Sequence, residues 1–142
     1  MKKYVVLDSN VVISAILSPS GSSYRALEKS LKNFKIIEPL RFGIELIEFA
    51  DKLKIGKKKA LDPINVSRIL KELSKSGIIT YVKTKNIQKL SRDPKDDDYL
   101  AVAIENKAIL VTGDKDLTIL KDEVMKKFKI SIQTPSEFLS NE

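Results

Sequence analysis

The stretch YVVLDSNVVISAIL, residues 4–17, decides the fold of this chain. Its first part is a short, continuous apolar run that stops at Asp8, and its second part is an apolar run with helical character. A continuous apolar run of this length before a polar stop is typical of a strand buried on both faces of a parallel sheet. The sequence therefore predicts a strand that leads directly into a helix, with a carboxylate at the junction.

The same alternation of strand and helix continues along the 142 residues. Further strands are predicted at FKIIEP (34–39), IITYV (78–82), AILVTGD (108–114) and KISIQT (129–134). Further helices are predicted at 22–33, 40–55, from the Asp62-Pro63 start to Gly77, at 96–106 and at 135–139. Alternation of this kind indicates an α/β fold. We expect one domain over residues 1–142, with three α/β/α layers around a central, mostly parallel five-stranded sheet.

Composition limits the chemistry that the chain supports. There is no cysteine and no histidine, which excludes disulfides, thiolate zinc sites and a Ser-His-Asp triad. A metal bound here would have only oxygen ligands, and such sites favour magnesium, calcium or manganese. The formal net charge of +7 makes nucleic acid the first partner to consider, although a lysine-rich surface also serves solubility.

The sequence gives no sign of a membrane segment. No apolar run approaches the roughly 20 residues that span a bilayer. The apolar stretch near the N-terminus is interrupted by Asp8 and Asn10, which a signal peptide would tolerate poorly. We expect a cytoplasmic protein with no membrane partner.

Two aspartates follow predicted strands. Asp8 ends the first strand, and Asp114 ends the fourth within ILVTGDKDL. Functional groups of open parallel sheets collect at the carboxyl ends of the strands, so these side chains are expected at one edge. Aspartate is also a common turn and cap residue, and each position taken alone has that structural explanation.

A third acidic group precedes the helix predicted at 96–106. Residues 93–98 read DPKDDD, and helix capping alone favours carboxylates there by about 0.3–1 kcal/mol each. The apolar stripe of this helix contains Tyr99 and Leu100, and Asp96 lies three and four residues before them. We therefore expect Asp96 to point back over the sheet, and Asp97 and Asp98 to point aside.

The helix predicted at 40–55 offers a fourth carboxylate. With about 100° per residue, Glu45 lies at the rim of the apolar face and Glu48 lies on the solvent side. Glu45 is thus the better candidate for a site, with Glu48 in reserve. If Asp8, Asp96 and Asp114 gather with Glu45, their negative charges repel unless a cation neutralises them. A divalent metal would do so and would support hydrolysis without histidine or cysteine.

These motifs resemble those of the PIN-domain ribonucleases, in particular the toxin-like (VapC-type) members of prokaryotic toxin–antitoxin pairs. VVLDSNVVISAIL is similar to the opening motif, ELIEFADKLKI to the helix with the second acid, DPKDDDYLAVA to the third motif and LVTGDKDL to the fourth. The resemblance covers nearly the whole chain. It implies a magnesium- or manganese-dependent endoribonuclease that acts on RNA, with a homodimer and a cognate antitoxin as the usual partners.

The resemblance also implies roles for individual residues. Asp8 and Asp96 would hold the principal metal, Asp114 with Asp116 would orient water molecules or hold a second ion, and Glu45 would position or activate the attacking water. The neighbouring residues that would support these carboxylates are Ser9, Asn10, Asp93 and Thr112.

Two alternative functions remain open from the sequence. One is a catalytically idle PIN-like domain that binds RNA or a protein without turnover. The other is an aspartate-dependent phosphatase with Asp8 as the nucleophile. That chemistry expects a second aspartate two residues later, where this chain has Asn10.

Overall fold

The computed structural model describes residues 2–55, 71, 73, 77–85 and 89–141. Within these residues the sheet consists of β1 (Lys3–Leu7), β2 (Phe34–Glu38), β3 (Ile79–Tyr81), β4 (Ile109–Val111) and β5 (Ile132–Gln133). The strand order is β3-β2-β1-β4-β5, and every neighbouring pair is parallel. The predicted α/β fold with a five-stranded sheet is confirmed, and the sheet is parallel throughout.

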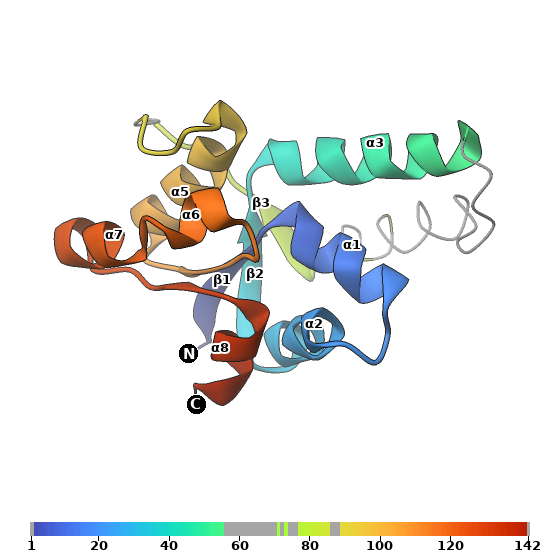
Figure 1. Cartoon of the computed structure of the whole chain (residues 1–142), viewed down its shortest axis with the longest axis horizontal. Coiled ribbons are helices and arrows are strands. Elements are labelled where there is room, and N and C mark those ends of the chain that lie inside the picture. Colours follow the sequence, from blue (N-terminus) through green and yellow to red (C-terminus); the bar gives the residue numbers. More distant parts are fainter. Residues whose placement is uncertain (1, 56–70, 72, 74–76, 86–88, 142) are drawn as a thin grey trace.

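Helices lie on both sides of the sheet (Figure 1). The side that carries the N-terminal helices has α1 (Ser9–Leu17), α2 (Ser22–Asn33) and α3 (Leu40–Ile55). The other side has α5 (Pro94–Asn106), α6 (Lys115–Thr118) and α7 (Lys121–Phe128), and α8 (Pro135–Ser140) lies against α2 and β5. Most of the helix predicted from Asp62-Pro63 to Gly77 lies outside the described residues.

The core is built around β1, which is the middle strand. Val5, Val6 and Leu7 are at most 1% exposed, because helices cover both faces of this strand. This burial explains why the sequence of β1 is continuously apolar rather than alternating. The apolar run therefore fixes where the strand ends, and so where Asp8 lies.

Two helices, α6 and α7, were not predicted from the sequence. The side chain of Asp114 caps α6 by accepting the backbone N–H of Asp116 at 2.9 Å. In α7 Val124 is buried, and Leu120 and Phe128, four residues to either side, are partly buried against the core, so the apolar stripe of this helix is short. Lys129, with φ of 60°, ends α7 in the left-handed conformation.

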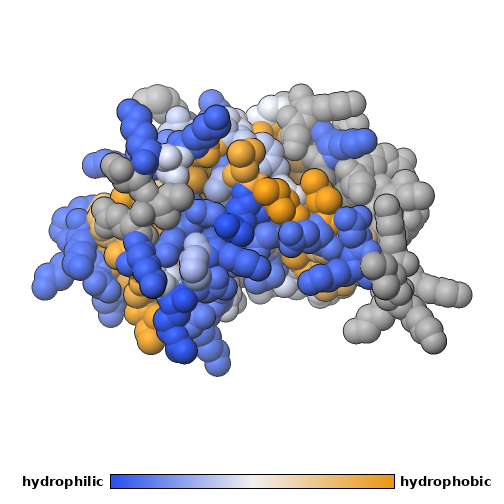
Figure 2. All heavy atoms as spheres, turned by 90° about the horizontal axis from the view of Figure 1, so that it is seen from above, coloured by the Kyte–Doolittle hydropathy of each residue, from blue (hydrophilic) through white to orange (hydrophobic). Residues whose placement is uncertain are grey.

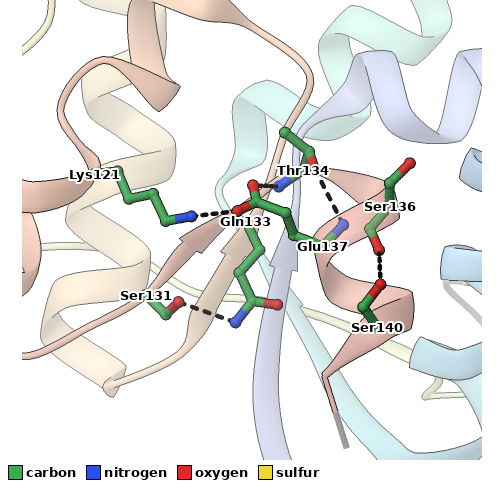
Figure 3. Close-up of polar contacts among 7 residues, drawn as sticks. All are labelled: Lys121, Ser131, Gln133, Thr134, Ser136, Glu137 and Ser140. Carbon is green, nitrogen blue, oxygen red and sulfur yellow. Dashed lines mark hydrogen bonds and ion pairs between the residues drawn. The ribbon is translucent and has the colours of Figure 1, made fainter.

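The last helix is fixed by a capping box, drawn in Figure 3. The backbone N–H of Glu137 donates to Oγ1 of Thr134 at 3.1 Å, and Oε1 of Glu137 accepts the N–H of Thr134 at 3.0 Å. Oε2 of Glu137 pairs with Lys121 of α7. Hydrogen bonding to Lys121 is the main reason that the pKa of Glu137 falls to about 2. This network joins the start of α8 to α7.

Among the described helices, none is both long and apolar enough to cross a bilayer.

Candidate functional site

The sheet brings Asp8 and Asp114 to the same edge. β1 and β4 are neighbours, and Leu7 pairs with Val111 at their carboxyl ends. Asp8 follows β1 directly, and its backbone N–H donates to the carbonyl of Val111 at 3.0 Å. Asp114 follows β4 after a two-residue turn and caps α6. Two acids from opposite ends of the chain are therefore placed side by side by strand pairing.

Thr112 connects these two acids. Its Oγ1 donates to Oδ2 of Asp8 at 2.8 Å and accepts the backbone N–H of Asp114 at 3.0 Å. Thr112 is fully buried and Asp8 is only 3% exposed, so these bonds are shielded from water. Oδ1 of Asp8 accepts the N–H of Asn10 at 3.2 Å, which makes Asp8 the N-cap of α1. Asn10 thus supports Asp8 through its backbone, while its side chain is exposed.

Three carboxylates form the tightest acidic group in the described part of the chain. One ligand oxygen from each of Asp96, Asp114 and Asp116 lies within 4.8 Å of the other two. The group includes Asp116, which was expected only to assist Asp114, and it does not include Asp8. The geometry therefore places Asp8 beside this group, where its charge still acts on Asp96.

The pKa values of these acids report their crowding. Burial is the largest cause that raises the pKa of Asp96 to about 7, and the charges of Asp114, Asp8 and Asp93 contribute to the same shift. Burial also raises the pKa of Asp8, while the hydrogen bond from Thr112 opposes this shift and the charge of Glu45 adds to it. Helix capping alone would not bring these carboxylates close to one another. Their mutual repulsion therefore indicates a site for a cation.

Glu45 of α3 lies at the rim, as its helical position predicts, and Glu48 is exposed. Oε1 of Glu45 accepts a 2.6 Å hydrogen bond from the phenol of Tyr99. Tyr99 is buried and also hydrogen-bonds Ser9, and its pKa is raised chiefly by burial and then by Glu45. The sequence pattern gave Tyr99 only a packing role. Its position three residues after Asp96, on the same stripe, is the signal that could have placed it at the site.

The other aspartates of the DPKDDD stretch have structural partners. Asp93 caps α5 by accepting the N–H of Lys95 at 3.0 Å. Asp97 is 3% exposed, which differs from the expectation that it points aside. It is buried because its Oδ1 accepts the N–H groups of Leu90 and Ser91 at 3.0 and 2.8 Å and so holds the preceding loop. The hydroxyl of Ser91 in turn donates to Oδ2 of Asp96 at 3.3 Å.

Arg41 is a further residue that the sequence pattern did not single out. It lies in the first turn of α3 and pairs through Nε with Oδ2 of Asp98. Hydrogen bonding to Asp98 is the main cause of its raised pKa, and the charge of Glu45 contributes. The guanidinium group of Arg41 is thus held by an aspartate of α5, within range of the charge of Glu45.

The residues present fit a divalent cation. Every candidate ligand is a carboxylate oxygen, the donor type that magnesium and manganese prefer. A bound cation would also offset the repulsion that raises the pKa of Asp96. Asp96, Asp114 and Asp116 are the side chains best placed to hold it.

Comparison with known proteins identifies the family of this chain. A family model described as the PIN domain matches residues 4–116. The chain belongs to the PIN-domain family. The segment matched by the PIN domain contains Asp8, Glu45 and all three carboxylates of the acidic group.

Two relatives of this PIN domain are informative. The chain is 34% identical over 149 aligned positions to the uncharacterized protein MJ1680 of Methanocaldococcus jannaschii, covering 98% of this chain and 91% of that protein. It also resembles a chain in the crystal structure of VapBC2 from Rickettsia felis bound to a DNA fragment from their promoter. That match has a TM-score of 0.60 at 19% identity and covers 92% of this chain and 98% of the other. At this identity the likeness concerns the PIN fold alone.

Proposed function

We propose that this chain is a magnesium- or manganese-dependent endoribonuclease that hydrolyses phosphodiester bonds of RNA. One observation carries the proposal: in a PIN domain, oxygens of Asp96, Asp114 and Asp116 lie within 4.8 Å of one another. Such a cluster is costly without a cation and suits one that neutralises a phosphate. Because Asp8 is 3% exposed and both its oxygens accept hydrogen bonds, it is poorly placed as a phosphatase nucleophile.

The acidic residues would have different roles in hydrolysis. Asp96, Asp114 and Asp116 would hold the cation, and Asp8 would support it from beside the group. When bound, a divalent ion lowers the pKa of water and neutralises charge on the phosphate. One oxygen of Glu45 is held by Tyr99, so its other oxygen is the candidate acceptor for the proton of the attacking water. Cleavage of the bond between phosphorus and the 3′-oxygen would leave a 5′-phosphate and a 3′-hydroxyl.

Basic residues around the acids would bind the RNA backbone. The chain carries a formal net charge of +7, and Lys95 and Lys115, both exposed, flank the acidic positions. Arg41 adds a guanidinium group whose Nε is engaged by Asp98 and whose terminal nitrogens are suited to a phosphate. Contacts of this kind supply affinity without reading a base sequence.

We further infer that the protein acts in the cytoplasm as the toxin of a toxin–antitoxin pair, as a homodimer bound by an antitoxin. The fold shared with a chain of the VapBC2 complex supports this. A protein partner is also supported by α3, where Leu40, Ile44 and Ile47 form an exposed apolar stripe. Figure 2, which looks onto the face above α3, shows hydrophobic side chains gathered beside hydrophilic ones.

Cleavage of RNA under metal control tests the enzymatic proposal. Purified protein is incubated with a mixture of structured RNAs, with EDTA or with added magnesium or manganese. We expect cleavage only with the ion, and products that carry 5′-phosphates. Asp96→Asn and Asp114→Asn should lower the cleavage rate by at least about a hundred-fold while thermal unfolding remains cooperative.

Matched variants provide the controls. Asp122→Asn removes an exposed acid of α7 and should leave cleavage unchanged. Glu45→Gln should abolish cleavage, whereas Glu48→Gln, on the exposed side of the same helix, should not. RNA binding that no ion alters, with no cleavage in any condition, would instead establish a catalytically idle domain.

A further inference from the structure

A buried acid next to the site has no part in the function proposed above. Glu38 is the last residue of β2 and is fully buried. Its Oε2 accepts the backbone N–H of Leu7 at 3.1 Å, and its Oε1 has no hydrogen-bond partner among the described residues. Burial of a carboxyl group is costly, so an acid at this position requires a specific reason.

The register of the sheet shows what this acid holds. The paired residues of β1 and β2 end at Val5 and Ile36, and the Glu38 side chain supplies an acceptor to β1 beyond that point. The backbone carbonyl of Glu38 is engaged on its other side by the N–H of Val82 at 3.0 Å. Glu38 therefore ties the end of β1 to β2 and β3 through one residue.

The amide that Glu38 binds belongs to the residue directly before Asp8. The N–H of Leu7 is bound from the β2 side by Glu38, and the N–H of Asp8 is bound from the β4 side by Val111. Consecutive amides at the strand end are thus held from opposite directions. The Asp8 side chain is in turn fixed by Thr112 from β4, so the Glu38 contact completes the support on the β2 side.

The charge of the site argues that Glu38 is not another ligand. Burial raises the pKa of Glu38 well above its usual range, and the charge of Asp8 adds to this shift. The neutral acid keeps its acceptor oxygen and adds no negative charge beside Asp8. A glutamine would have the same shape and the same acceptor.

We propose that Glu38 is a positioning residue that sets the end of β1, through the Leu7 amide, so that Asp8 faces the acidic group of Asp96, Asp114 and Asp116. The proposal rests on the nuclease function above, because Asp8 matters only if this edge binds a cation. Its role is to hold backbone in place, and it is required as a hydrogen-bonding group rather than as a charge.

The test compares two substitutions of similar size with the intact chain. Glu38→Gln keeps the acceptor, and Glu38→Met removes it while filling similar volume. Manganese affinity is measured by calorimetry, RNA cleavage by kcat and KM, and hydrogen exchange of the Leu7 amide by NMR. Ile37→Val, a buried change on the same strand, is the control for simple loss of packing.

We expect Glu38→Gln to retain the manganese affinity, kcat and Leu7 protection of the wild type. Glu38→Met should bind manganese about ten-fold more weakly and lower kcat with little change in KM, and its Leu7 amide should exchange faster. Ile37→Val should lose stability without altering manganese binding. If Glu38→Met does not fold, Glu38→Asp, which shortens the reach by one methylene, takes its place.

Two results would overturn the proposal. Glu38→Gln as inactive as Asp96→Asn would mean that the charge is needed, and unchanged manganese affinity and Leu7 exchange in Glu38→Met would mean that nothing is positioned. If the wild type cleaves no RNA, the nuclease function fails, and manganese binding still decides the role of Glu38. If the wild type also binds no manganese, the positioning of Asp8 for a cation is rejected. Hydrogen exchange of the Leu7 amide in Glu38→Met then decides what remains: unchanged exchange rejects the contact itself, and faster exchange shows that Glu38 only supports the end of the strand.

Discussion

The hydroxyl group of Thr112 donates to Oδ2 of Asp8 at 2.8 Å, across 104 positions of sequence. The same hydroxyl accepts the N–H of Asp114 at 3.0 Å, so one buried side chain sets two carboxylates at once. Such a bond inside a low-dielectric site fixes geometry more firmly than an exposed one. The threonine is therefore as informative about the site as the acids themselves.

Thr112→Val tests this link. The change keeps the shape but leaves the Asp114 amide without its acceptor and Asp8 without its donor, so we expect the free energy of unfolding to fall by about 1–3 kcal/mol. Manganese affinity should fall about ten-fold. Thr112→Ser, which keeps the hydroxyl, should retain most of both, and calorimetry with urea unfolding measures them. Equal behaviour of the two variants would show that the hydroxyl does not organise the site.

Asp96→Asn separates repulsion from ion binding. In EDTA the variant should be at least as stable as the wild type, because one charge is removed from a crowded group. With manganese at a hundred times its dissociation constant, the wild type should gain about 2.7 kcal/mol and the variant far less. Thermal unfolding in both conditions measures this. A wild type that is not stabilised by any divalent ion would contradict the metal site.

The stability of the metal-free protein should depend on pH through Glu38. Its folded pKa lies above the unfolded value because the carboxyl group is buried beside Asp8. The stability that Glu38 contributes is therefore fully present below the unfolded pKa and is lost as pH rises through the folded pKa. Glu38→Gln does not titrate, so the wild type should lose stability relative to this variant as pH rises from the ordinary glutamate value toward the raised pKa of the folded state. Urea unfolding in EDTA measures the difference, and a difference that stays constant with pH would show that Glu38 is not held neutral.

Arg41→Ala tests the proposed phosphate contact. We expect the KM for RNA to rise about ten-fold with kcat nearly unchanged, and the salt dependence of RNA binding to fall by about one unit of slope. Arg25→Ala, an exposed arginine on α2, should change neither quantity. An equal effect of both substitutions would point to net charge rather than to a placed contact.

Thr134→Ala tests the capping box far from the acids. Loss of the bond to the Glu137 amide should lower the free energy of unfolding by about 1 kcal/mol and leave manganese affinity unchanged. Ser136→Ala, in the same helix, should change stability very little, because the substitution keeps the backbone carbonyl that accepts the hydroxyl of Ser140. A large loss of metal binding in Thr134→Ala would show that α8 communicates with the site.

Much of the fold could be predicted because its signals are local. The run before Asp8 is continuously apolar because β1 is covered on both faces, and the place where the run ends locates the acid. Glu45 and Glu48 were separated by helical angle alone, and their exposure in the structure follows that angle. These features depend on the chain's own period and need no knowledge of distant contacts.

The remaining features depend on partners that are remote in sequence. Asp97 is buried because the loop amides of Leu90 and Ser91 turn toward it, which no helical period reveals. In the sequence, Glu38 is an ordinary polar residue at the end of a strand. Its role becomes visible only through its hydrogen bond to the Leu7 amide. α7 was missed although Leu120, Val124 and Phe128 recur at helical spacing, because this apolar stripe covers only about two turns of an eight-residue helix.

The position of β1 in the middle of the sheet has a consequence for synthesis. Asp8 leaves the ribosome before its neighbours on β4, which must be translated and must close a loop spanning 104 positions before Thr112 reaches it. A nascent or prematurely terminated polypeptide therefore holds the first acid without the others. The topology itself delays assembly of the acidic group until β4 and the residues after it have been made.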